Sequence, residues 1–337
     1  MNTAAMPFAL PGQPVLLLGE ALVDEFADQH IAGGAPLNVA RSLAALGQPA
    51  LLATRLGEDA AAALILQSLR RFGLSEAGVQ RDAGQATGRV TISESANGGH
   101  SFHIHEDAAW DHLDTQPLAE HFAERPPAIV YFGSLAQRSP AARQRLGALL
   151  DELGQRGSLR YLDLNLRAGS AAPALAEHCL ARADWVKLND VELVQLMAWF
   201  DLPGDPALVG GGDASACSAA VRTLAQRFAL QRIVLTRGAA GYACFDRHGL
   251  VEAEGGGVPL ARLVDTVGAG DAFSAMALAA TLQGKPIAKA LALANRFAAA
   301  MCGERGPVPA DEAFYLPWHA ALGRGKAAAA DATRSAA

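Results

Sequence analysis

The chain has 337 residues, of which 51% are hydrophobic and 18% are charged. This composition excludes intrinsic disorder over most of the length and allows one large domain or two ordinary ones. The formal net charge is −6 and no basic run occurs, so we expect no nucleic-acid partner. No run of about 18 apolar residues occurs either, so we expect no contact with a membrane through a spanning segment.

The N-terminal residues lack the charged-then-apolar order of a signal peptide. The four cysteines lie far apart in the sequence and form no Cys-x-x-Cys pair. Both features are typical of a cytoplasmic protein with reduced thiols.

Short apolar segments alternate with helical patterns along most of the chain. The expected strands are nearly all apolar, which is typical of a parallel sheet that is buried on both faces. The strand-then-helix order predicts an α/β fold, a three-layer α/β/α sandwich with a mainly parallel central sheet. The expected strands are Val15–Leu18, Ala50–Arg55, Ile129–Phe132, Tyr161–Asp163, Trp185–Leu188 and Ile233–Thr236. The expected helices are Leu37–Leu46, Ala60–Arg71, Ala141–Arg156, Ala172–Arg182, Val191–Phe200, Ala216–Phe228, Asp271–Leu282 and Ile287–Met301.

One region departs from this alternation of strands and helices. Thr87–Ser93 and His100–His105 alternate like strands, and Asn97-Gly98-Gly99 lies between them, so we expect a β-hairpin. A hairpin that protrudes from an α/β body often covers a site as a lid, to which Glu25–Ile31 is expected to add a strand. In this organisation residues 1–24, 33–86 and 107–325 form the α/β domain, residues 25–32 and 87–106 form a small β-lid, and residues 326–337 form a frayed tail.

The segment Asp265-Thr-Val-Gly-Ala-Gly-Asp-Ala-Phe273 places a glycine-rich turn directly before an apolar helix. Unpaired N–H groups at a helix N-terminus bind anions such as phosphate, and the helix dipole adds to their effect. Asp271 could accept a proton from a hydroxyl while these amides stabilise a transferring phosphoryl group. Taken alone, Asp271 could equally be a helix cap.

This nine-residue segment closely resembles the C-terminal signature of the ribokinase-like carbohydrate kinases, the PfkB family. The resemblance implies that Asp271 is the catalytic base. It also implies that the amides of Gly268, Ala269 and Gly270 form the anion hole. Further motifs follow in family order, so that the resemblance extends over nearly the whole chain.

The segment Gly33-Gly-Ala-Pro-Leu-Asn-Val-Ala40 places a double glycine before a helix that starts with proline. It resembles the N-terminal signature of the same family, and of its fructokinases in particular. The resemblance implies that Gly33 and Gly34 form the hinge of the lid and border the bound sugar, and that Asn38 forms a hydrogen bond with the sugar.

Two motifs at predicted strand ends are assigned to the sugar by the same resemblance. Gly19-Glu-Ala-Leu-Val-Asp24 is similar to the motif after the first strand of sugar kinases, in which Asp24 would accept hydrogen bonds from sugar hydroxyls. Asp163-Leu-Asn-Leu-Arg167 is similar to the family's D-x-N-x-R, in which Asn165 and Arg167 would line the sugar pocket. Ligands of open α/β sheets bind beyond the carboxyl ends of strands, where these motifs lie.

Further matches point to ATP. Asn189-Asp-Val-Glu192 resembles the family's N-x-x-E, which organises Mg²⁺ and phosphate largely through water, because Mg²⁺ retains its waters. Thr236-Arg-Gly-Ala-Ala-Gly241 resembles the turn that borders the nucleotide. The ATP-binding residues that the resemblance implies are Asn189, Thr236, Gly238, Gly241 and Asn295, with Glu192 acting on Mg²⁺ through water. It also implies a monovalent cation, K⁺, at Asp265 and Thr266.

The lid departs from the family pattern. Many fructokinases and ketodeoxygluconate kinases carry an arginine near the position of His105. The missing guanidinium disfavours a carboxylate-bearing sugar and leaves His105 as the expected lid contact to the substrate. His100, His103, His105 and His112 could instead form a metal site, although solvated or sugar-contacting histidines are the favoured interpretation.

The resemblance implies ATP-dependent phosphorylation of a primary hydroxyl of a monosaccharide, with Mg²⁺. Fructose is the favoured acceptor, because the segments 33–40, 132–135 and 163–167 together are most similar to fructokinases. The alternatives are 2-keto-3-deoxygluconate, another ketose, ribose and a nucleoside, the last disfavoured by the polar histidines of the lid. A sugar-binding regulator without catalysis is the non-enzyme alternative. The exposed edge of the lid predicts a homodimer through the β-lid.

Overall fold

The computed structural model describes residues 13–27, 29–94, 100–260, 262–309 and 311–323, and of residues 93, 94 and 100–102 it describes only the backbone. The turn expected at Asn97-Gly98-Gly99 and the tail expected at 326–337 lie outside the described residues. No helix within the described residues has the length and apolar character that crossing a bilayer requires.

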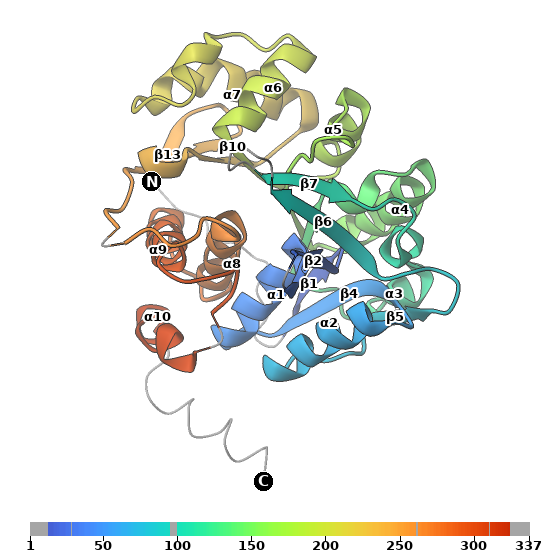
Figure 1. The fold of residues 1–337 in the computed structure, drawn as a ribbon. Coiled ribbons are helices and arrows are strands. Elements are labelled where there is room, and N and C mark those ends of the chain that lie inside the picture. Colours follow the sequence, from blue (N-terminus) through green and yellow to red (C-terminus); the bar gives the residue numbers. More distant parts are fainter. Residues whose placement is uncertain (1–12, 28, 95–99, 261, 310, 324–337) are drawn as a thin grey trace.

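A nine-stranded sheet runs through the centre of the molecule (Figure 1). Its strands lie in the order β13-β12-β11-β10-β9-β8-β1-β4-β5. All strands from β11 to β5 in this order are parallel, and β12 and β13 extend one edge as antiparallel neighbours. The strands are β1 (Val15–Leu18), β4 (Ala50–Gly57), β5 (Val79–Asp82), β8 (Ile129–Gly133), β9 (Leu159–Asp163), β10 (Trp185–Asn189), β11 (Arg232–Thr236), β12 (Tyr242–Asp246) and β13 (Val251–Gly255).

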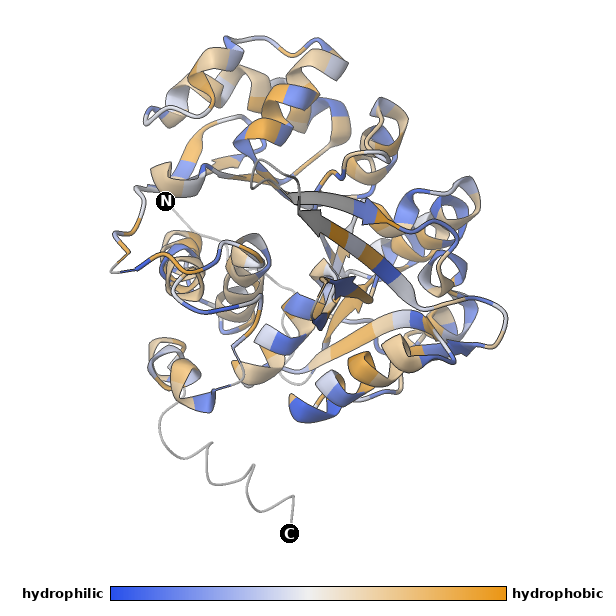
Figure 2. Ribbon diagram, in the orientation of Figure 1, coloured by the Kyte–Doolittle hydropathy of each residue, from blue (hydrophilic) through white to orange (hydrophobic). Residues whose placement is uncertain are grey.

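Helices cover both faces of this sheet and complete the predicted three-layer sandwich (Figure 1). Helices α1, α2, α8, α9 and α10 pack on one face, and α3 to α7 pack on the other. The helices are α1 (Ala35–Ala45), α2 (Ala60–Arg71), α3 (Gln116–His121), α4 (Pro140–Gln155), α5 (Pro173–Leu180), α6 (Asp190–Phe200), α7 (Ser218–Phe228), α8 (Ala269–Leu282), α9 (Ile287–Met301) and α10 (Leu316–Ala321). In Figure 2 helix α2 carries both hydrophobic and polar stretches, as a helix with one buried face should.

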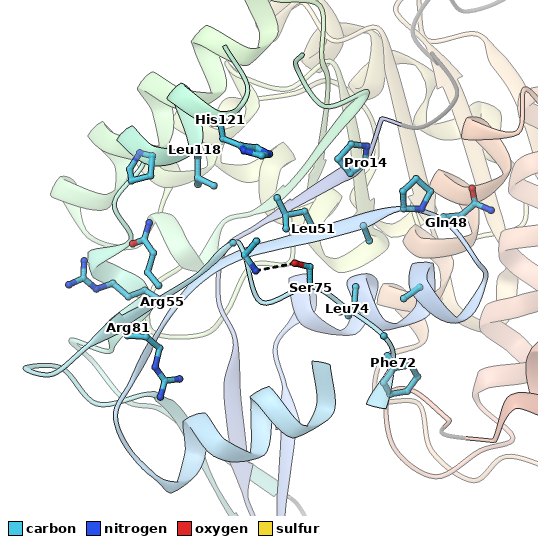
Figure 3. Close-up of a pocket in the computed structure, with 18 of the residues that line it drawn as sticks. Pro14, Gln48, Leu51, Arg55, Phe72, Leu74, Ser75, Arg81, Leu118 and His121 are labelled. Atoms are coloured by element: carbon cyan, nitrogen blue, oxygen red, sulfur yellow. Dashed lines mark hydrogen bonds between the residues drawn. The ribbon is translucent and has the colours of Figure 1, made fainter. Parts of the chain in front are cut away.

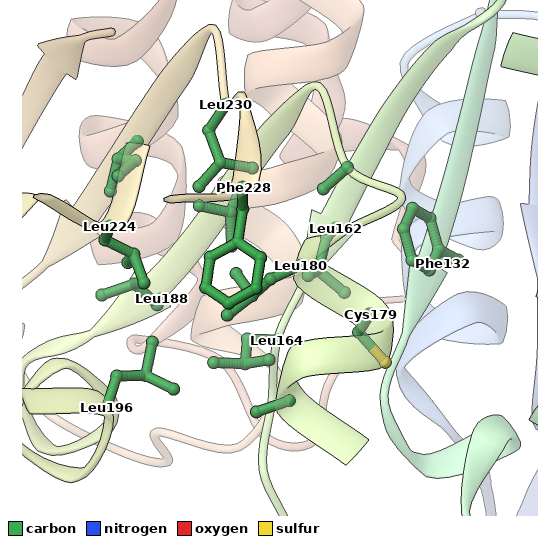
Figure 4. Close-up of a cluster of buried hydrophobic side chains, with 14 of the residues drawn as sticks. Phe132, Leu162, Leu164, Cys179, Leu180, Leu188, Leu196, Leu224, Phe228 and Leu230 are labelled. Carbon is green, nitrogen blue, oxygen red and sulfur yellow. The ribbon is translucent and has the colours of Figure 1, made fainter. Parts of the chain in front are cut away.

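The first strand shows how the sheet divides the interior into two cores. Val15 and Leu17 belong to the core under α1 and α8, whereas Leu16 and Leu18 belong to the core under α4 to α7. This alternation follows from the two-residue period of a strand, and it explains why the whole strand is apolar. Figure 4 shows the core under α4 to α7, where side chains of β9, α5 and α7 meet.

A second, four-stranded sheet projects from the body in the order β3-β2-β6-β7 (Figure 1). It consists of β2 (Leu22–Glu25), β3 (His30–Gly33), β6 (Gly88–Glu94) and β7 (His100–Ile104). The antiparallel pair β6 and β7 is the predicted hairpin.

The N-terminal part of this lid is larger than expected. It supplies two strands instead of one, and the first begins at Leu22, so that Asp24 lies on the lid sheet and not on the α/β body. The reason is a long-range pairing, in which β2 lies parallel to β6. A local sequence pattern contains no sign of such a partner.

The core under α4 to α7 predicts a stability difference between two leucines. Leu162 is 0% exposed, whereas Leu208 is 51% exposed. We expect Leu162→Ala to lower the free energy of unfolding by about 2–5 kcal/mol, because it leaves a cavity. Leu208→Ala should change it by less than about 0.5 kcal/mol. Thermal unfolding measures both, and an equal fall in Tm for the two variants would contradict the assigned core.

Candidate active site

The glycine-rich turn before α8 leaves backbone donors unpaired. Gly268 caps the helix at φ 78°, and a Cβ there would lie 2.7 Å from Pro307. The N–H of Ala269 donates to the carbonyl of Thr266 at 3.2 Å and thereby closes the turn. Within the described residues no hydrogen bond occupies the N–H of Gly268 or Gly270. Two of the three amides predicted for the anion hole are therefore available to a ligand.

Asp271 lies in the first turn of α8 and contacts α1. Asn38 Nδ2 donates to Asp271 Oδ2 at 2.7 Å, so the predicted base and a predicted sugar ligand lie together. Burial, followed by repulsion from Asp163, raises the pKa of Asp271, whereas the Asn38 hydrogen bond and Lys187 lower that pKa. A carboxylate whose pKa is raised is a better proton acceptor near neutral pH than an ordinary aspartate.

A buried ion pair lies beneath the anion-binding turn. Lys187 Nζ donates to both oxygens of Asp163, at 2.9 and 3.0 Å. Ser274 Oγ and the Tyr131 hydroxyl also donate to Asp163, at 2.8 and 3.3 Å. A Cβ at Gly270 would lie 2.9 Å from Lys187 Nζ. The glycine therefore lets a fixed positive charge approach the backbone that would hold an anion.

Two further carboxyl groups lie near Asp271. Burial raises the pKa of Glu20 to about 7 and that of Asp24 to about 6. Arg167 opposes both pKa shifts, and the charge of Asp271 adds to both. Asp24 Oδ2 lies 2.5 Å from the point where a Cβ on Gly33 would stand, so glycine makes room for this carboxylate.

The double glycine joins lid strand β3 to helix α1. Gly34 has φ 106°, and a Cβ there would lie 2.8 Å from the carbonyl oxygen of Glu20. Only glycine fits this conformation without strain. The structure thus places Gly33 and Gly34 between lid and body, where the predicted hinge requires them.

The register of the lid sheet shows on which face of the lid His105 lies. Asp24 pairs with Val90, and Val90 pairs with Ile104, so these residues share one face. Thr91 lies on the other face, and its Oγ1 is hydrogen-bonded to His105 Nε2 at 2.9 Å. His105 therefore faces away from Asp24 and does not join the group of carboxylates. Strand alternation decides this orientation, which the motif alone could not give.

Asn165 and Arg167 follow β9 as expected. Asn165 adopts a left-handed φ of 41°, and its carbonyl accepts a hydrogen bond from Ser134 Oγ at 3.4 Å. Arg167 is exposed, and its guanidinium stabilises the charged forms of Glu20 and Asp24. An exposed cation beside buried carboxyl groups is well placed to contact an incoming ligand.

Asn189 and Glu192 form a capping box at the start of α6. Asn189 Oδ1 accepts from the N–H of Glu192 at 2.8 Å, and Glu192 Oε2 accepts from the N–H of Asn189 at 2.8 Å. Glu192 Oε1 accepts from the N–H of Leu166 at 2.7 Å. The carboxylate thus ties the end of β10 to the loop after β9. Its contact with Mg²⁺ through water stays a prediction.

The residues predicted for the nucleotide lie along one side of the sheet. Thr236 ends β11 and pairs in register with Asn189 at the end of β10. The turn Gly238–Gly241 lies against the residues that follow β13. Asn295 of α9 reaches the same segment, because its Nδ2 donates to the carbonyl of Gly256 at 2.9 Å.

Asp265 connects two loops that border α8. Its Oδ1 accepts from the N–H of Val267 at 2.9 Å, and its Oδ2 accepts from the N–H of Gly306 at 3.2 Å. The loop after α9 therefore lies beside Asp265 and Thr266, as the predicted K⁺ site requires. The binding of K⁺ itself stays a prediction.

A cavity of about 1080 Å³ lies at the other end of the sheet (Figure 3). Pro14 and Leu51, at the amino ends of β1 and β4, line it together with Leu118 and His121. None of the site residues described above belongs to its lining. Ligands of open α/β sheets bind at the carboxyl ends of strands, so this cavity is not the candidate active site.

Three buried residues of the site were not predicted as site residues from the sequence. They are Glu20, Arg41 and Lys187. A lysine inside the otherwise apolar strand β10 is a signal that could have identified Lys187, because a buried ammonium requires a partner. Glu20 and Arg41 lie in a turn and a helix, where charged residues are ordinary, so the sequence contains no comparable sign.

The raised pKa of Glu20 predicts a pH-dependent stability. The ordinary pKa of a glutamate is 4.5 and the pKa of Glu20 in the folded state is about 7. Between these two pH values the folded state retains the proton, whereas the unfolded state has lost it. The stability that the protonated group supplies is full below pH about 4.5 and is lost as the pH rises through about 7. We expect Glu20→Gln, which cannot ionise, to gain Tm relative to the unaltered protein between about pH 5 and about pH 8. Glu124→Gln, at an exposed position, is the control. A Tm difference for Glu20→Gln that does not grow with pH would contradict the assignment.

Comparison with known proteins shows the family of this chain. A family model described as pfkB family carbohydrate kinase matches residues 16–313. Fructokinase-1 of Oryza sativa subsp. japonica is 26% identical over 305 residues, covering 86% of this chain and 88% of that protein. Arabidopsis thaliana ribokinase complexed with ribose and ATP has a TM-score of 0.75 at 23% identity, over 92% of this chain and 98% of that one. Fructokinase with bound ATP from Xylella fastidiosa has a TM-score of 0.71 at 22% identity, over 87% of this chain and 93% of that one. The chain therefore has the ribokinase-like fold and belongs to the pfkB family of carbohydrate kinases, phosphotransferases with an alcohol group as acceptor.

Proposed function

We propose that this sugar kinase is an ATP-dependent fructokinase, which phosphorylates a primary hydroxyl of fructose. The observation that carries the proposal is the position of Asp271, a half-buried carboxyl with a raised pKa next to unpaired amides at the N-terminus of α8. The choice of fructose is supported by the relatives, because curated proteins from Oryza sativa, Zea mays and Klebsiella pneumoniae that resemble this chain are named fructokinases.

Asp271 supplies the proton acceptor of the proposed reaction. It takes the proton of the sugar hydroxyl as the hydroxyl oxygen forms a bond to the γ-phosphorus of ATP. The bond from that phosphorus to the oxygen bridging the β- and γ-phosphates breaks, and ADP leaves with the electron pair. The amides of Gly268 and Gly270 donate to the transferring group. Beneath them, the ammonium end of the Lys187–Asp163 ion pair faces this backbone before the reaction begins.

The sugar lies between the lid and the strand ends in this proposal. Asp24 accepts hydrogen bonds from sugar hydroxyls, while Asn38, Asn165 and Arg167 contact the sugar from the body. Closure of the lid at Gly34 would exclude water, which otherwise competes as acceptor.

The nucleotide is proposed to lie across the ends of β10 and β11. Asn189, Thr236, the turn Gly238–Gly241 and Asn295 line this side of the sheet. Mg²⁺ fits here because Mg²⁺ prefers oxygen ligands and retains waters, and Glu192 supplies two carboxylate oxygens at the end of β10. Each oxygen accepts one backbone N–H and so has a lone pair left for a water bound to the ion. When bound, the ion would neutralise charge on the phosphates.

Three further features belong to the same proposal. K⁺ would bind near Asp265 and Thr266, beside the loop after α9. A homodimer would form through the lid, whose strands β3 and β7 are both sheet edges. A cytoplasmic location fits the four cysteines, which are all unpaired.

An acceptor with an apolar group is a second candidate, and the lid favours it. Leu22, Val90 and Ile92 form a small apolar cluster in the lid, against which Phe26 and Ile104 pack. Val90 and Ile104 share the face of Asp24, whereas His105, which counted against a nucleoside, lies on the other face. A nucleoside therefore stands beside 2-keto-3-deoxygluconate, other ketoses and ribose as an alternative substrate.

A panel of acceptors tests the proposed substrate. ADP release from MgATP would be followed with fructose, 2-keto-3-deoxygluconate, ribose, tagatose, glucose and adenosine, each with and without KCl. We expect the highest kcat/KM for fructose, by roughly tenfold or more over each other sugar, because misplaced hydroxyls leave buried polar groups unpaired. A similar preference for adenosine would support the apolar acceptor instead. The absence of turnover with every acceptor would contradict the proposed function.

The anion-binding turn predicts that activity depends on a glycine at position 268. A Cβ at Gly268 would press on the backbone of Pro307, so Gly268→Ala should displace the free amides. We expect kcat to fall by roughly 10²–10³-fold, as when one donor of an oxyanion hole is lost. Gly284→Ala is the matched control, because Gly284 also has a positive φ but has open space around its Cα. Equal kcat values for the two variants would contradict the role of the turn.

A further inference from the structure

Arg41 is a buried cation that none of the sequence motifs explains. It lies on α1, one turn after Asn38, and its side chain is 6% exposed. Burial lowers the pKa of Arg41 to about 10, and the charges of Asp271 and Asp24 act against this shift. Among the described residues, no carboxylate forms a direct ion pair with it. Such a group is costly to bury, so its hydrogen bonds should show what it does.

The guanidinium binds three acceptors on three different segments. Arg41 Nη2 donates to the carbonyl of Ala32, at 3.0 Å, and to Asn38 Oδ1. Arg41 Nη1 donates to Ser68 Oγ of α2 at 3.1 Å. Ala32 belongs to lid strand β3 and directly precedes the double glycine. One side chain therefore connects the lid, helix α2 and the site.

The amide of Asn38 is held at both ends by charged groups. Its oxygen accepts from Arg41, and its Nδ2 donates to Asp271 Oδ2 at 2.7 Å. A cation and a carboxylate demand the same orientation of the amide, with oxygen towards Arg41 and nitrogen towards Asp271. Without the cation, rotation of the amide would break one charged hydrogen bond instead of two. Arg41 thus reinforces the orientation in which the nitrogen of Asn38 faces the base.

We propose that Arg41 is a positioning residue that couples the lid strand β3 to the base Asp271 through Asn38. The same nitrogen, Nη2, contacts the carbonyl of Ala32 and the amide of Asn38. A shift of β3 about the double glycine therefore moves the guanidinium of Arg41. The hydrogen bond from Arg41 to Asn38 changes with it, and so does the hydrogen bond from Asn38 to Asp271. This inference rests on the proposed role of Asp271 as base.

A double-mutant cycle tests the connection to the base. It compares Arg41→Met, Asn38→Ala and the double variant in kcat and KM, with an acceptor that the unaltered enzyme phosphorylates. We expect Arg41→Met alone to lower kcat roughly 10- to 100-fold, as misplacement of a catalytic group does, with the KM for ATP unchanged. In the Asn38→Ala background the same change should cost less than about threefold, because the two residues act as one unit. An equal loss of kcat in both backgrounds would overturn the proposal.

Two further variants separate positioning from folding. Arg41→Lys retains the charge but replaces a fork of donors with one ammonium, so it should fold and yet lose part of kcat. Arg145→Met is the matched control, since Arg145 also donates to two carbonyls, of Asp111 at 2.7 Å and Leu113 at 3.2 Å. We expect a kcat within about threefold of the unaltered enzyme for Arg145→Met. A loss of kcat in the Arg145 variant as large as that in Arg41→Lys would show that neither effect is specific to the site.

Hydrogen exchange tests the connection to the lid without any turnover. The amides of residues 22–25 and 30–33 should exchange roughly tenfold faster or more in Arg41→Met, and in Arg41→Lys to a smaller extent, because β3 loses its anchor. Exchange in β8 and β9 should be unchanged. Unaltered protection of β2 and β3 in both variants would overturn the lid part of the proposal. If the unaltered enzyme phosphorylates no acceptor, the proposed function fails, and this experiment still decides whether Arg41 holds the lid.

Discussion

Bringing like charges together away from water is costly, and four carboxyl groups of this molecule gather where the strand ends, the lid and the start of α8 meet. They are Glu20, Asp24, Asp163 and Asp271. If all of them were ionised and unpaired, they would repel one another in a medium of low polarity. Lys187 neutralises Asp163, while Arg41 and Arg167 act on the remaining carboxyl groups. The pKa values nevertheless stay raised, so Glu20 retains its proton up to about pH 7 and Asp24 up to about pH 6.

The fold brings these groups together from distant parts of the chain. The parallel strands place the ends of β1, β9 and β10 at the same edge, and α8 begins there with its free amides. The lid supplies Asp24 from a different sheet, and the double glycine lets that sheet turn against the body. Asp24 of the lid and the anion-binding turn of α8 thus lie near one carboxylate, Asp271, and we propose that the lid closes over it. This combination is what transfer of a phosphoryl group away from water requires.

Sequence reasoning predicted the body well, because its strands are apolar runs and its helices carry clear start signals. The expected bounds of α2 and α9 are those of the structure. It missed β5, whose residues Val79–Asp82 are mostly polar, as an edge strand allows, and it missed β2, whose partner β6 is distant in sequence. In the site, the motif residues Asp271 and Asn38 lie in contact, while their roles in catalysis and sugar binding stay predictions. Arg41 was not predicted, because its role depends on three partners from separate segments. The register places His105 on the face opposite Asp24, which pattern alone could not give, so its contact with the substrate stays an untested prediction.

Single-turnover phosphoryl transfer measures the central claim most directly. Enzyme in excess would be mixed with labelled MgATP and saturating fructose, and formation of the sugar phosphate would be followed in the unaltered protein and in Asp271→Asn. Calorimetry would measure the binding of ATP and fructose by both. The account predicts that the variant binds both ligands and transfers the phosphoryl group at least about 10²–10⁴-fold more slowly, since it lacks the proton acceptor. Transfer within about tenfold of the unaltered rate would show that Asp271 is not the base, and the arrangement of charges around it would then need another explanation.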